Sequence, residues 1–209
     1  MRLITWMLAA VLLAGCSMGK PPTTTEPPKP QPVTDGSKLS SAEAEQTVKA
    51  RATATVNAIK TKNLKGFAHP EKGIRFSPYA RVDAAKDVVI AAADWDRDLF
   101  SEKRLYQWGT FDGSGEPINL GLTDYWQRFV YGHDFAAAPQ VGYNAYLRGG
   151  SNTPNNAREA YPTAIFVDYH FPGFDPKVQG LDWQTLRLAF EQKDGQWYLV
   201  GIIHDQWTI

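Results

Sequence analysis

Asp168 and His170 form the pair of side chains in this sequence best suited to acid–base chemistry. They stand two positions apart in segment 164–171, whose odd-numbered positions are all apolar. Because side chains alternate between the two faces of a β-strand, this spacing places the carboxyl and the imidazole on one surface. A carboxylate can fix the tautomer of an imidazole while the ring exchanges protons near neutral pH. We therefore treat Asp168 and His170 as candidate catalytic residues.

Four further side chains could complete a ligand-binding site around this pair. Arg75 and Arg187 could hold an anionic group, and Tyr198 or His204 could polarise an oxygen. These roles come from side-chain chemistry alone. A structural alternative is that Asp168 and His170 form an internal polar network with Arg187, which would fix the register of the sheet without touching a ligand.

A metal site is a third use for the same donor atoms. Asp168, His170 and His204 could in principle supply ligands, but no local spacing of ligand residues in the sequence supports such a site. The chain has one cysteine, Cys16, so a cluster of thiolate ligands is excluded. We expect no metal and no cofactor.

Near the N-terminus, a short apolar run ends in small residues and the single cysteine. Arg2 provides a positive charge, residues 3–13 are apolar apart from Thr5, and the run closes with Leu13-Ala14-Gly15-Cys16. This stretch resembles the lipobox of bacterial lipoproteins. The resemblance implies a signal peptide over residues 1–15, a diacylglyceryl group on Cys16, and fatty acyl chains such as palmitate that anchor the protein stably in a membrane. An ordinary secretory signal with an accidental cysteine is the alternative.

Residues 16–38 are rich in proline and threonine and are unsuited to a hydrophobic core. We expect a lipid-anchored tether, which in the polyproline II conformation would rise ~3.1 Å per residue and hold the domain roughly 50–60 Å from the bilayer. Ser17 is not the aspartate that retains many lipoproteins in an inner membrane. The expected location is the extracytoplasmic side of the cell membrane, or the outer membrane where the host has one.

Charge and composition exclude one class of partner. Acidic and basic residues number 22 each, so no net positive charge favours binding to nucleic acid. The expected partners are the membrane, through Cys16, and a small molecule or an envelope component.

The elements that must position the candidate residues begin with a helix. Ser40 and Glu43 have the spacing of a capping box, and the apolar stripe that follows predicts a helix to about Lys60. A second helix, capped by Thr123, is expected to end near Gly132. Short strands are expected at residues 74–76, 88–92, 105–111 and 141–147.

The chain closes with its clearest element, a hairpin of residues 183–193 and 196–207 around an Asp194-Gly195 turn. Simple alternation across this turn divides the side chains between two faces. The expected apolar face holds Leu186, Leu188, Phe190, Leu199 and Ile203. The expected polar face holds Thr185, Arg187, Glu191, Tyr198 and His204.

Helices followed by a run of antiparallel strands predict an α+β fold for a single domain of residues 39–209. In it, N-terminal helices pack on a curved, mainly antiparallel sheet. The order of elements and the closing stretch FEQKDGQWYLVGI at 190–202 resemble the cone-like fold of nuclear transport factor and SnoaL-like proteins. The resemblance implies a pocket between the concave face of the sheet and the helices. In enzymes of this group, the pocket supplies an acid/base pair for proton abstraction, dehydration or epoxide opening.

A second resemblance covers most of the domain. Segments 69–79, 108–117, 169–176 and 201–207 resemble those of a poorly characterised group of bacterial envelope lipoproteins, which brings no known reaction with it. We expect non-catalytic binding of a small molecule or envelope component. The alternatives are a small lyase, isomerase or hydrolase that uses Asp168 and His170, and a protein-docking module. A deep pocket containing Asp168, His170 and Arg187 would favour an enzyme or a ligand binder, whereas a filled domain with an exposed aromatic patch would favour docking.

Overall fold

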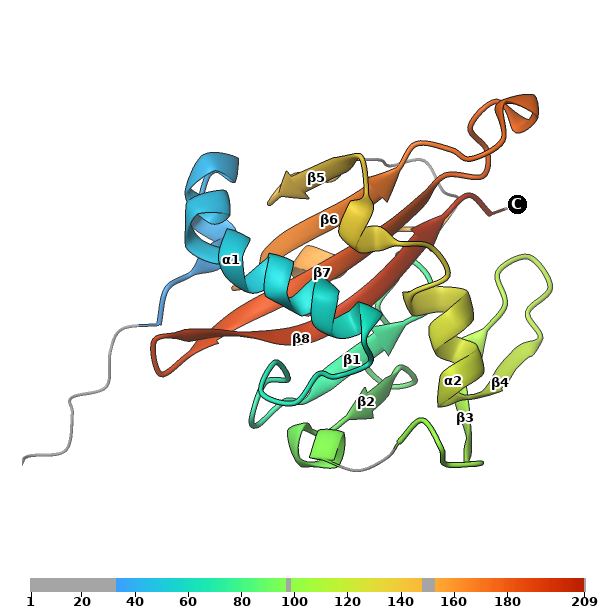
Figure 1. Ribbon diagram of the computed structural model, residues 1–209, viewed down its shortest axis with the longest axis horizontal. Coiled ribbons are helices and arrows are strands. Elements are labelled where there is room, and N and C mark those ends of the chain that lie inside the picture. The colour runs from blue at the N-terminus through green and yellow to red at the C-terminus, as the bar shows by residue number, and fades with distance from the viewer. Residues whose placement is uncertain (1–32, 97–98, 148–152, 209) are drawn as a thin grey trace, which may run out of the picture. The chain divides into compact units, whose positions relative to one another are not determined.

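The structure is a computed structural model that describes residues 33–96, 99–147 and 153–208 (Figure 1). The chain divides into two units, Met1–Pro30 and Gln31–Ile209, and all described residues belong to the second. The expected signal peptide and Cys16 lie outside the described residues. Within the part that is described, no helix is both long and apolar enough to cross a membrane.

A six-stranded sheet forms the centre of the domain, in the order β2-β1-β8-β7-β6-β5. All neighbouring strands are antiparallel except β1 and β8, which run parallel. The α+β class and the mainly antiparallel sheet are therefore confirmed. The strands are β1 (Ile74–Ser77), β2 (Val88–Ile90), β5 (Gln140–Tyr143), β6 (Ile165–Phe171), β7 (Gln184–Lys193) and β8 (Gln196–Gln206).

The long C-terminal hairpin of β7 and β8 is confirmed. Asp194 and Gly195 form its turn with φ values of 50° and 77°, as a two-residue turn between twisted strands requires. Simple alternation does not hold along its whole length, however. Ala189 pairs with Gly201 and Phe190 with Leu199, so β8 contains one extra residue at position 200. This irregularity is a β-bulge, and a one-residue bulge exchanges the two faces of the strand beyond it.

Because of the bulge, two side chains lie on the opposite face from the one predicted. Ile203 lies opposite Arg187, and His204 lies opposite Leu186. Cross-strand partners share a face, so Ile203 is on the face of Arg187 and His204 is on the face of Leu186. The prediction that placed Ile203 with the apolar set and His204 with the polar set was wrong.

Helix α1 (Ser41–Lys60) begins where the sequence predicts. The Ser40 side chain accepts a hydrogen bond from the Glu43 backbone N–H, and the Glu43 carboxylate accepts one from the Ser40 backbone N–H. The capping box thus satisfies backbone donors that the first turn leaves without partners. The buried face of α1 carries Val48, Val56 and Ile59, and the helix lies across the sheet (Figure 1).

A second, two-stranded sheet consists of β3 (Leu105–Thr110) and β4 (Pro117–Gly121). It leads into α2 (Leu122–Tyr125) and a π-helical turn, η3 (Trp126–Val130). Thr123 does not cap this helix, because the N-cap residue is Gly121, without a side-chain hydrogen bond. The Thr123 hydroxyl instead donates to the Phe100 carbonyl oxygen at 3.0 Å, so that prediction was wrong.

Several short elements complete the described chain. The first of them, η1 (Gly36–Lys38), lies before residue 39, where the domain was expected to start. Asn144 Nδ2 donates to the Gly36 carbonyl oxygen at 2.9 Å, and Gly36 N donates to the Thr163 carbonyl oxygen at 2.9 Å. Residues in this stretch are thus attached to the domain. The short helices are η1 (Gly36–Lys38), η2 (Ala92–Asp96), η4 (Phe135–Ala137), α3 (Ala157–Ala160) and η5 (Pro176–Val178).

Both faces of the large sheet are covered by apolar side chains. On the α1 face, Val167, Leu186 and Phe190 belong to one large cluster together with α1 and the aromatic side chains of α2 and η3. On the other face, a smaller cluster surrounds Phe166 and Ala189. Its members are Val82, Ala157, Tyr161, Ala164, Phe166, Ala189, Val200 and Ile203. The face that carries Asp168 and Arg187 is therefore an interior surface.

Candidate functional site

Asp168 and Arg187 form a fully buried ion pair across β6 and β7. They lie directly opposite each other, and both side chains are 0% exposed. Arg187 Nε donates to Asp168 Oδ1 and Arg187 Nη2 donates to Asp168 Oδ2, each at 2.8 Å. Leu147 N also donates to Asp168 Oδ2 at 3.3 Å. The carboxylate is thus held by protein donors and has no surface that a substrate could reach.

The surroundings of Arg187 keep it charged. Burial lowers the pKa of its guanidinium, but the negative charge and the hydrogen bonds of Asp168 outweigh this effect, so the pKa is raised. The guanidinium carbon lies 4.2 Å from the centre of the Tyr146 ring, a cation–π contact. Nη1 is buried and has no hydrogen-bond partner among the described residues. Arg187 is a buried structural cation in this arrangement.

His170 shares the buried face of Asp168, as the strand alternation predicts. The imidazole belongs to a residue that is 2% exposed, and Nδ1 shares a hydrogen bond with Thr185 Oγ1 at 2.7 Å. The Trp183 ring lies 6.0 Å away, centre to centre. The structure thus brings Asp168, His170 and Arg187 together in the interior of the domain.

His204 lies on the opposite face of the sheet from these residues. Its ring packs edge-on against Phe129 at 5.8 Å, and Nε2 shares a hydrogen bond with Gln206 Oε1 at 3.0 Å. Burial lowers its pKa to about 4, so the ring is neutral at physiological pH. Asp168, His170 and His204 therefore cannot bind one metal ion together. No group of three possible ligands gathers anywhere in the described segments.

Arg75 and Tyr198 are separated from the buried group. Arg75 Nη1 donates to the carbonyl oxygens of Ala84 and Asp87, at 3.0 and 3.4 Å. The Tyr198 hydroxyl donates to Gln196 Oε1 at 2.9 Å, near the turn of the long hairpin. Arg75 thus fixes the loop that contains Ala84 and Asp87, and Tyr198 makes its hydrogen bond within the first residues of β8.

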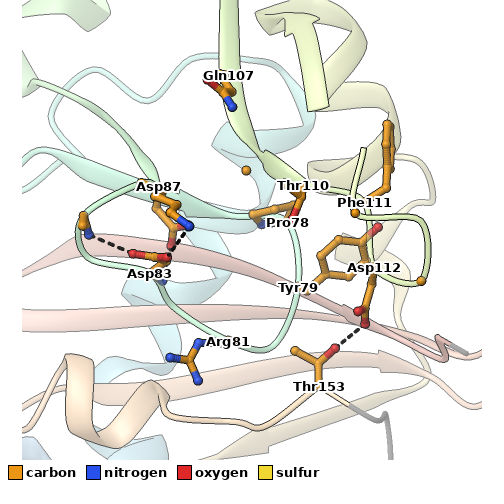
Figure 2. Close-up of a pocket in the computed structure, with 15 residues that line it drawn as sticks. Pro78, Tyr79, Arg81, Asp83, Asp87, Gln107, Thr110, Phe111, Asp112 and Thr153 are labelled. Carbon is orange, nitrogen blue, oxygen red and sulfur yellow. Dashed lines mark hydrogen bonds and ion pairs between the residues drawn. The ribbon is translucent and has the colours of Figure 1, made fainter. Parts of the chain in front are cut away.

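A cleft of about 820 Å³ lies between the loop that follows β1 and the β3–β4 hairpin (Figure 2). It draws its lining from residues 78–87, from residues 107–115 and from Thr153. None of the six candidate residues predicted from the sequence lines it. The charged lining side chains are Arg81, Asp83, Lys86, Asp87 and Asp112.

Asp87 organises one wall of this cleft. Its Oδ2 accepts hydrogen bonds from Ser77 Oγ at 2.5 Å and from Asp83 N at 3.0 Å. Burial raises the pKa of the Asp87 carboxyl to about 6, against the opposing effect of these hydrogen bonds. Together with Arg75, which holds the carbonyl oxygens of the same loop, Asp87 fixes the loop as a wall.

Aromatic rings of both segments and polar groups of the hairpin complete the lining of the cleft. The Tyr79 ring packs edge-on against Phe129 at 5.8 Å, and burial raises the pKa of its hydroxyl. The Arg128 guanidinium carbon lies 4.4 Å from the centre of the Phe111 ring. Asp112 Oδ2 accepts a hydrogen bond from Thr153 Oγ1 at 2.5 Å. A ligand in the cleft would meet both apolar surface and hydrogen-bonding groups, as in most small-molecule sites.

A second, smaller cleft of about 420 Å³ lies where the β6–β7 connection meets the end of β8. His133 and Phe174 stack at its edge with ring centres 3.9 Å apart. Phe174, Leu181 and Trp207 line it and are 41%, 48% and 41% exposed. These three side chains form an exposed apolar patch.

Part of the lining of the larger cleft falls in two segments that the sequence analysis singled out. Segments 69–79 and 108–117 contain Pro78 and Tyr79 of that lining and its hairpin residues Gly109, Thr110, Phe111, Asp112, Gly113 and Gly115. Reasoning from paired acid and base side chains missed them, because the lining residues come from a loop and a hairpin turn. Comparisons with protein-family models, with curated proteins and with solved structures find no match to this chain.

Proposed function

We propose that this protein is a lipid-anchored, extracytoplasmic lipoprotein whose domain binds a small polar molecule or an envelope component without catalysis. The observation that carries the proposal is the cleft of about 820 Å³ between the loop after β1 and the β3–β4 hairpin. Its volume lies within the roughly 300–1,000 Å³ typical of small-molecule sites. Its lining combines charged side chains with the rings of Tyr79 and Phe111.

The burial of the candidate acid and base argues against the enzymatic alternative. Asp168, His170 and Arg187 are at most 2% exposed, and neither of the two clefts contains them. A general base must come within hydrogen-bond reach of the proton that it removes, which here would require opening of the sheet face. The structural reading of Asp168 and His170 is therefore preferred.

The cone-like character of the fold is part of this proposal. What supports it is α1 lying across a sheet that ends in the long hairpin. In a SnoaL-like enzyme the space between helix and sheet would hold the substrate. Here buried side chains from α1 and the sheet belong to one continuous apolar cluster in that space, which favours binding at the cleft instead.

The membrane anchor rests on the lipobox-like stretch that ends at Cys16. Cells that produce the protein should incorporate labelled palmitate into it, and the protein should fractionate with the cell membrane or the outer membrane. A Cys16→Ala variant should lose both the label and the membrane association, because no thiol remains to receive the diacylglyceryl group. Retention of membrane association by the unlabelled variant would contradict lipid anchoring.

Binding at the cleft can be tested by thermal shift with the full chain in detergent micelles. A library of envelope fragments and small polar compounds should contain members that raise the melting temperature, since a ligand of the native state stabilises it by mass action. Thr110 lines the cleft and is exposed, so Thr110→Trp should obstruct it. Glu102→Trp, at an exposed position outside the lining, is the matched control. Equal shifts in both variants would exclude the cleft as the site.

A second candidate function is protein docking. The apolar cluster between α1 and the sheet and the exposed patch of Phe174, Leu181 and Trp207 are the two features that the sequence analysis expects of a docking module. Exposed apolar side chains that cluster often mark interaction surfaces. A photo-crosslinking amino acid at Phe174 should then give a discrete adduct in the cell envelope. The same group at Leu105, which is 68% exposed and lies on another sheet, should not.

A further inference from the structure

The charges of the larger cleft are mixed, and both signs occur on one loop. Arg81 and Lys86 contribute two cations, while Asp83, Asp87 and Asp112 contribute three carboxyl groups. Four of these five side chains lie within the seven-residue stretch 81–87 that forms one wall. The opposite wall, apart from Asp112, supplies neutral polar groups and the Phe111 ring.

We propose that the cleft binds a zwitterion, a molecule that carries both a free ammonium and a free carboxylate, as short peptides do. This inference rests on the proposed function, in which the cleft is the ligand site. It adds the chemical class of the ligand and assigns Arg81 to the carboxylate and Asp83 to the ammonium.

Arg81 is the group best placed to receive a carboxylate. It is exposed at the cleft, and its guanidinium makes no hydrogen bond or ion pair with any residue of the described segments (Figure 2). A guanidinium presents a planar set of donors that matches the two oxygens of a carboxylate. Because no partner among the described residues has to be displaced, Arg81 can make both hydrogen bonds to a ligand.

Asp83 is available to receive an ammonium group. One of its oxygens, Oδ1, accepts a hydrogen bond from Ala85 N at 3.0 Å. The other, Oδ2, lies 3.9 Å from Lys86 Nζ, and the two side chains are 38% and 74% exposed. An exposed ion pair at this distance contributes little stability and exchanges readily. A ligand ammonium can therefore replace the lysine at Oδ2.

Ligands with a single charge fit the cleft less well. An anion bound to Arg81 would share the cleft with the carboxylates of the same loop, and a cation bound to Asp83 would share it with Arg81 and Lys86. Like charges in proximity are unfavourable, whereas a ligand that carries both signs can meet each of them with its opposite. The mixed lining thus selects for paired charges.

The size and the remaining surface of the cleft favour a short peptide over a single amino acid. The volume of about 820 Å³ is near the upper end of small-molecule sites, which span roughly 300–1,000 Å³. Tyr79 and Phe111 offer apolar surface to a side chain. Gln107 and Thr110, on the opposite wall, can hydrogen-bond a peptide group.

Isothermal titration calorimetry with the full chain in micelles tests the inference. The probes are the dipeptide alanyl-phenylalanine, its N-acetylated form, its C-terminal amide and the doubly capped form. Loss of a hydrogen-bonded charge pair should weaken binding at least about tenfold for each cap. Arg81→Gln should remove the preference for the free carboxylate, and Asp83→Asn the preference for the free ammonium. The asparagine keeps an oxygen for Ala85 N, so the loop should stay folded.

Lys103→Gln and Glu102→Gln provide matched controls, since both residues are exposed and lie outside the lining of the cleft. They should leave all four affinities unchanged. Equal binding of the free and doubly capped dipeptides, or no binding of any probe, would overturn the zwitterion assignment. Thr110→Trp separates this failure from failure of the proposed function. If a library compound binds the wild type and loses affinity in Thr110→Trp, the cleft remains a ligand site of another class.

Discussion

Replacement of Asp168 by asparagine removes the negative charge that compensates Arg187 inside the domain. Both side chains of the native pair are 0% exposed, and two hydrogen bonds of 2.8 Å join them. Removing one partner of a buried pair leaves an uncompensated buried charge, which typically costs about 3–5 kcal/mol. A domain of this size is stable by roughly 5–15 kcal/mol, so Asp168→Asn should remove a large part of the free energy of unfolding.

The reciprocal change and the double variant separate this cost from other effects. Arg187→Met keeps a long side chain against the Tyr146 ring, which lies 4.2 Å from the native guanidinium carbon. Arg187→Met alone should also lower the free energy of unfolding by about 3–5 kcal/mol, because the Asp168 carboxylate remains buried without its partner. In the double variant neither charge of the pair remains, and the asparagine still accepts from Leu147 N. The double variant should therefore lose less free energy of unfolding than the two single variants together, by about 3 kcal/mol or more.

Equilibrium unfolding in urea measures these free energies, and far-ultraviolet circular dichroism confirms that each variant folds. The slope of free energy against urea should stay constant if the native and unfolded states keep their exposed surfaces. Single costs below about 1 kcal/mol, or strict additivity in the double variant, would show that the pair is not buried as described. Such a result would return Asp168 to the list of possible catalytic groups.

Three further predictions follow from other residues. Ser40→Ala should cost about 1 kcal/mol in urea unfolding through loss of the capping box with Glu43, whereas Ser41→Ala should be nearly neutral. Burial raises the pKa of Asp87 to about 6, so the free energy of unfolding of the wild type should fall as pH rises from about 4 to 6. Asp87→Asn should abolish that fall and raise the free energy of unfolding at pH 7 by roughly 2 kcal/mol. Burial lowers the pKa of His204 to about 4, so its contribution to stability should be lost as pH falls from about 6.5 towards 4. Nuclear magnetic resonance of its ring protons should show no titration above about pH 5, and a midpoint near 6.5 would contradict its burial.

Elements with strong local signals could be predicted from the sequence. The capping box of Ser40 and Glu43 defines the start of α1 through side-chain hydrogen bonds three residues apart. Asp194 and Gly195 tolerate the positive φ values that a tight turn needs, so the long hairpin is encoded at its turn. In both cases the residues that determine the structure are neighbours in the chain.

Features that depend on distant pairing could not be predicted in this way. The bulge in β8 arises where Ala189 pairs with Gly201 and Phe190 with Leu199, and nothing in simple alternation indicates the extra residue between them. As a consequence, His204 was placed on the wrong face and included in a hypothetical metal site. Strand β4 was also missed, because it starts at a proline and, within the described segments, pairs with β3 alone.

The candidate site shows the same limit in another form. Alternation along β6 correctly placed Asp168 and His170 on one face, but it could not reveal what covers that face. The covering residues come from segments far apart in the chain, including Val82, Ala157 and Tyr161. A polar strand face therefore indicates shared orientation, not access to solvent.

Arg75 links the buried interior to the proposed ligand site. The sequence suggested that its guanidinium would hold an anionic ligand, but in the structure it donates to the carbonyl oxygens of Ala84 and Asp87. Those hydrogen bonds, with the Asp87 contacts to Ser77 and Asp83, hold the loop that carries the exposed charges of the cleft. In the proposed site, Arg75 would therefore influence a ligand only through the position of the loop. Arg75 and Asp87, which are partly buried, thus support the loop. The side chains proposed to recognise the ligand, Arg81 and Asp83, lie on that loop.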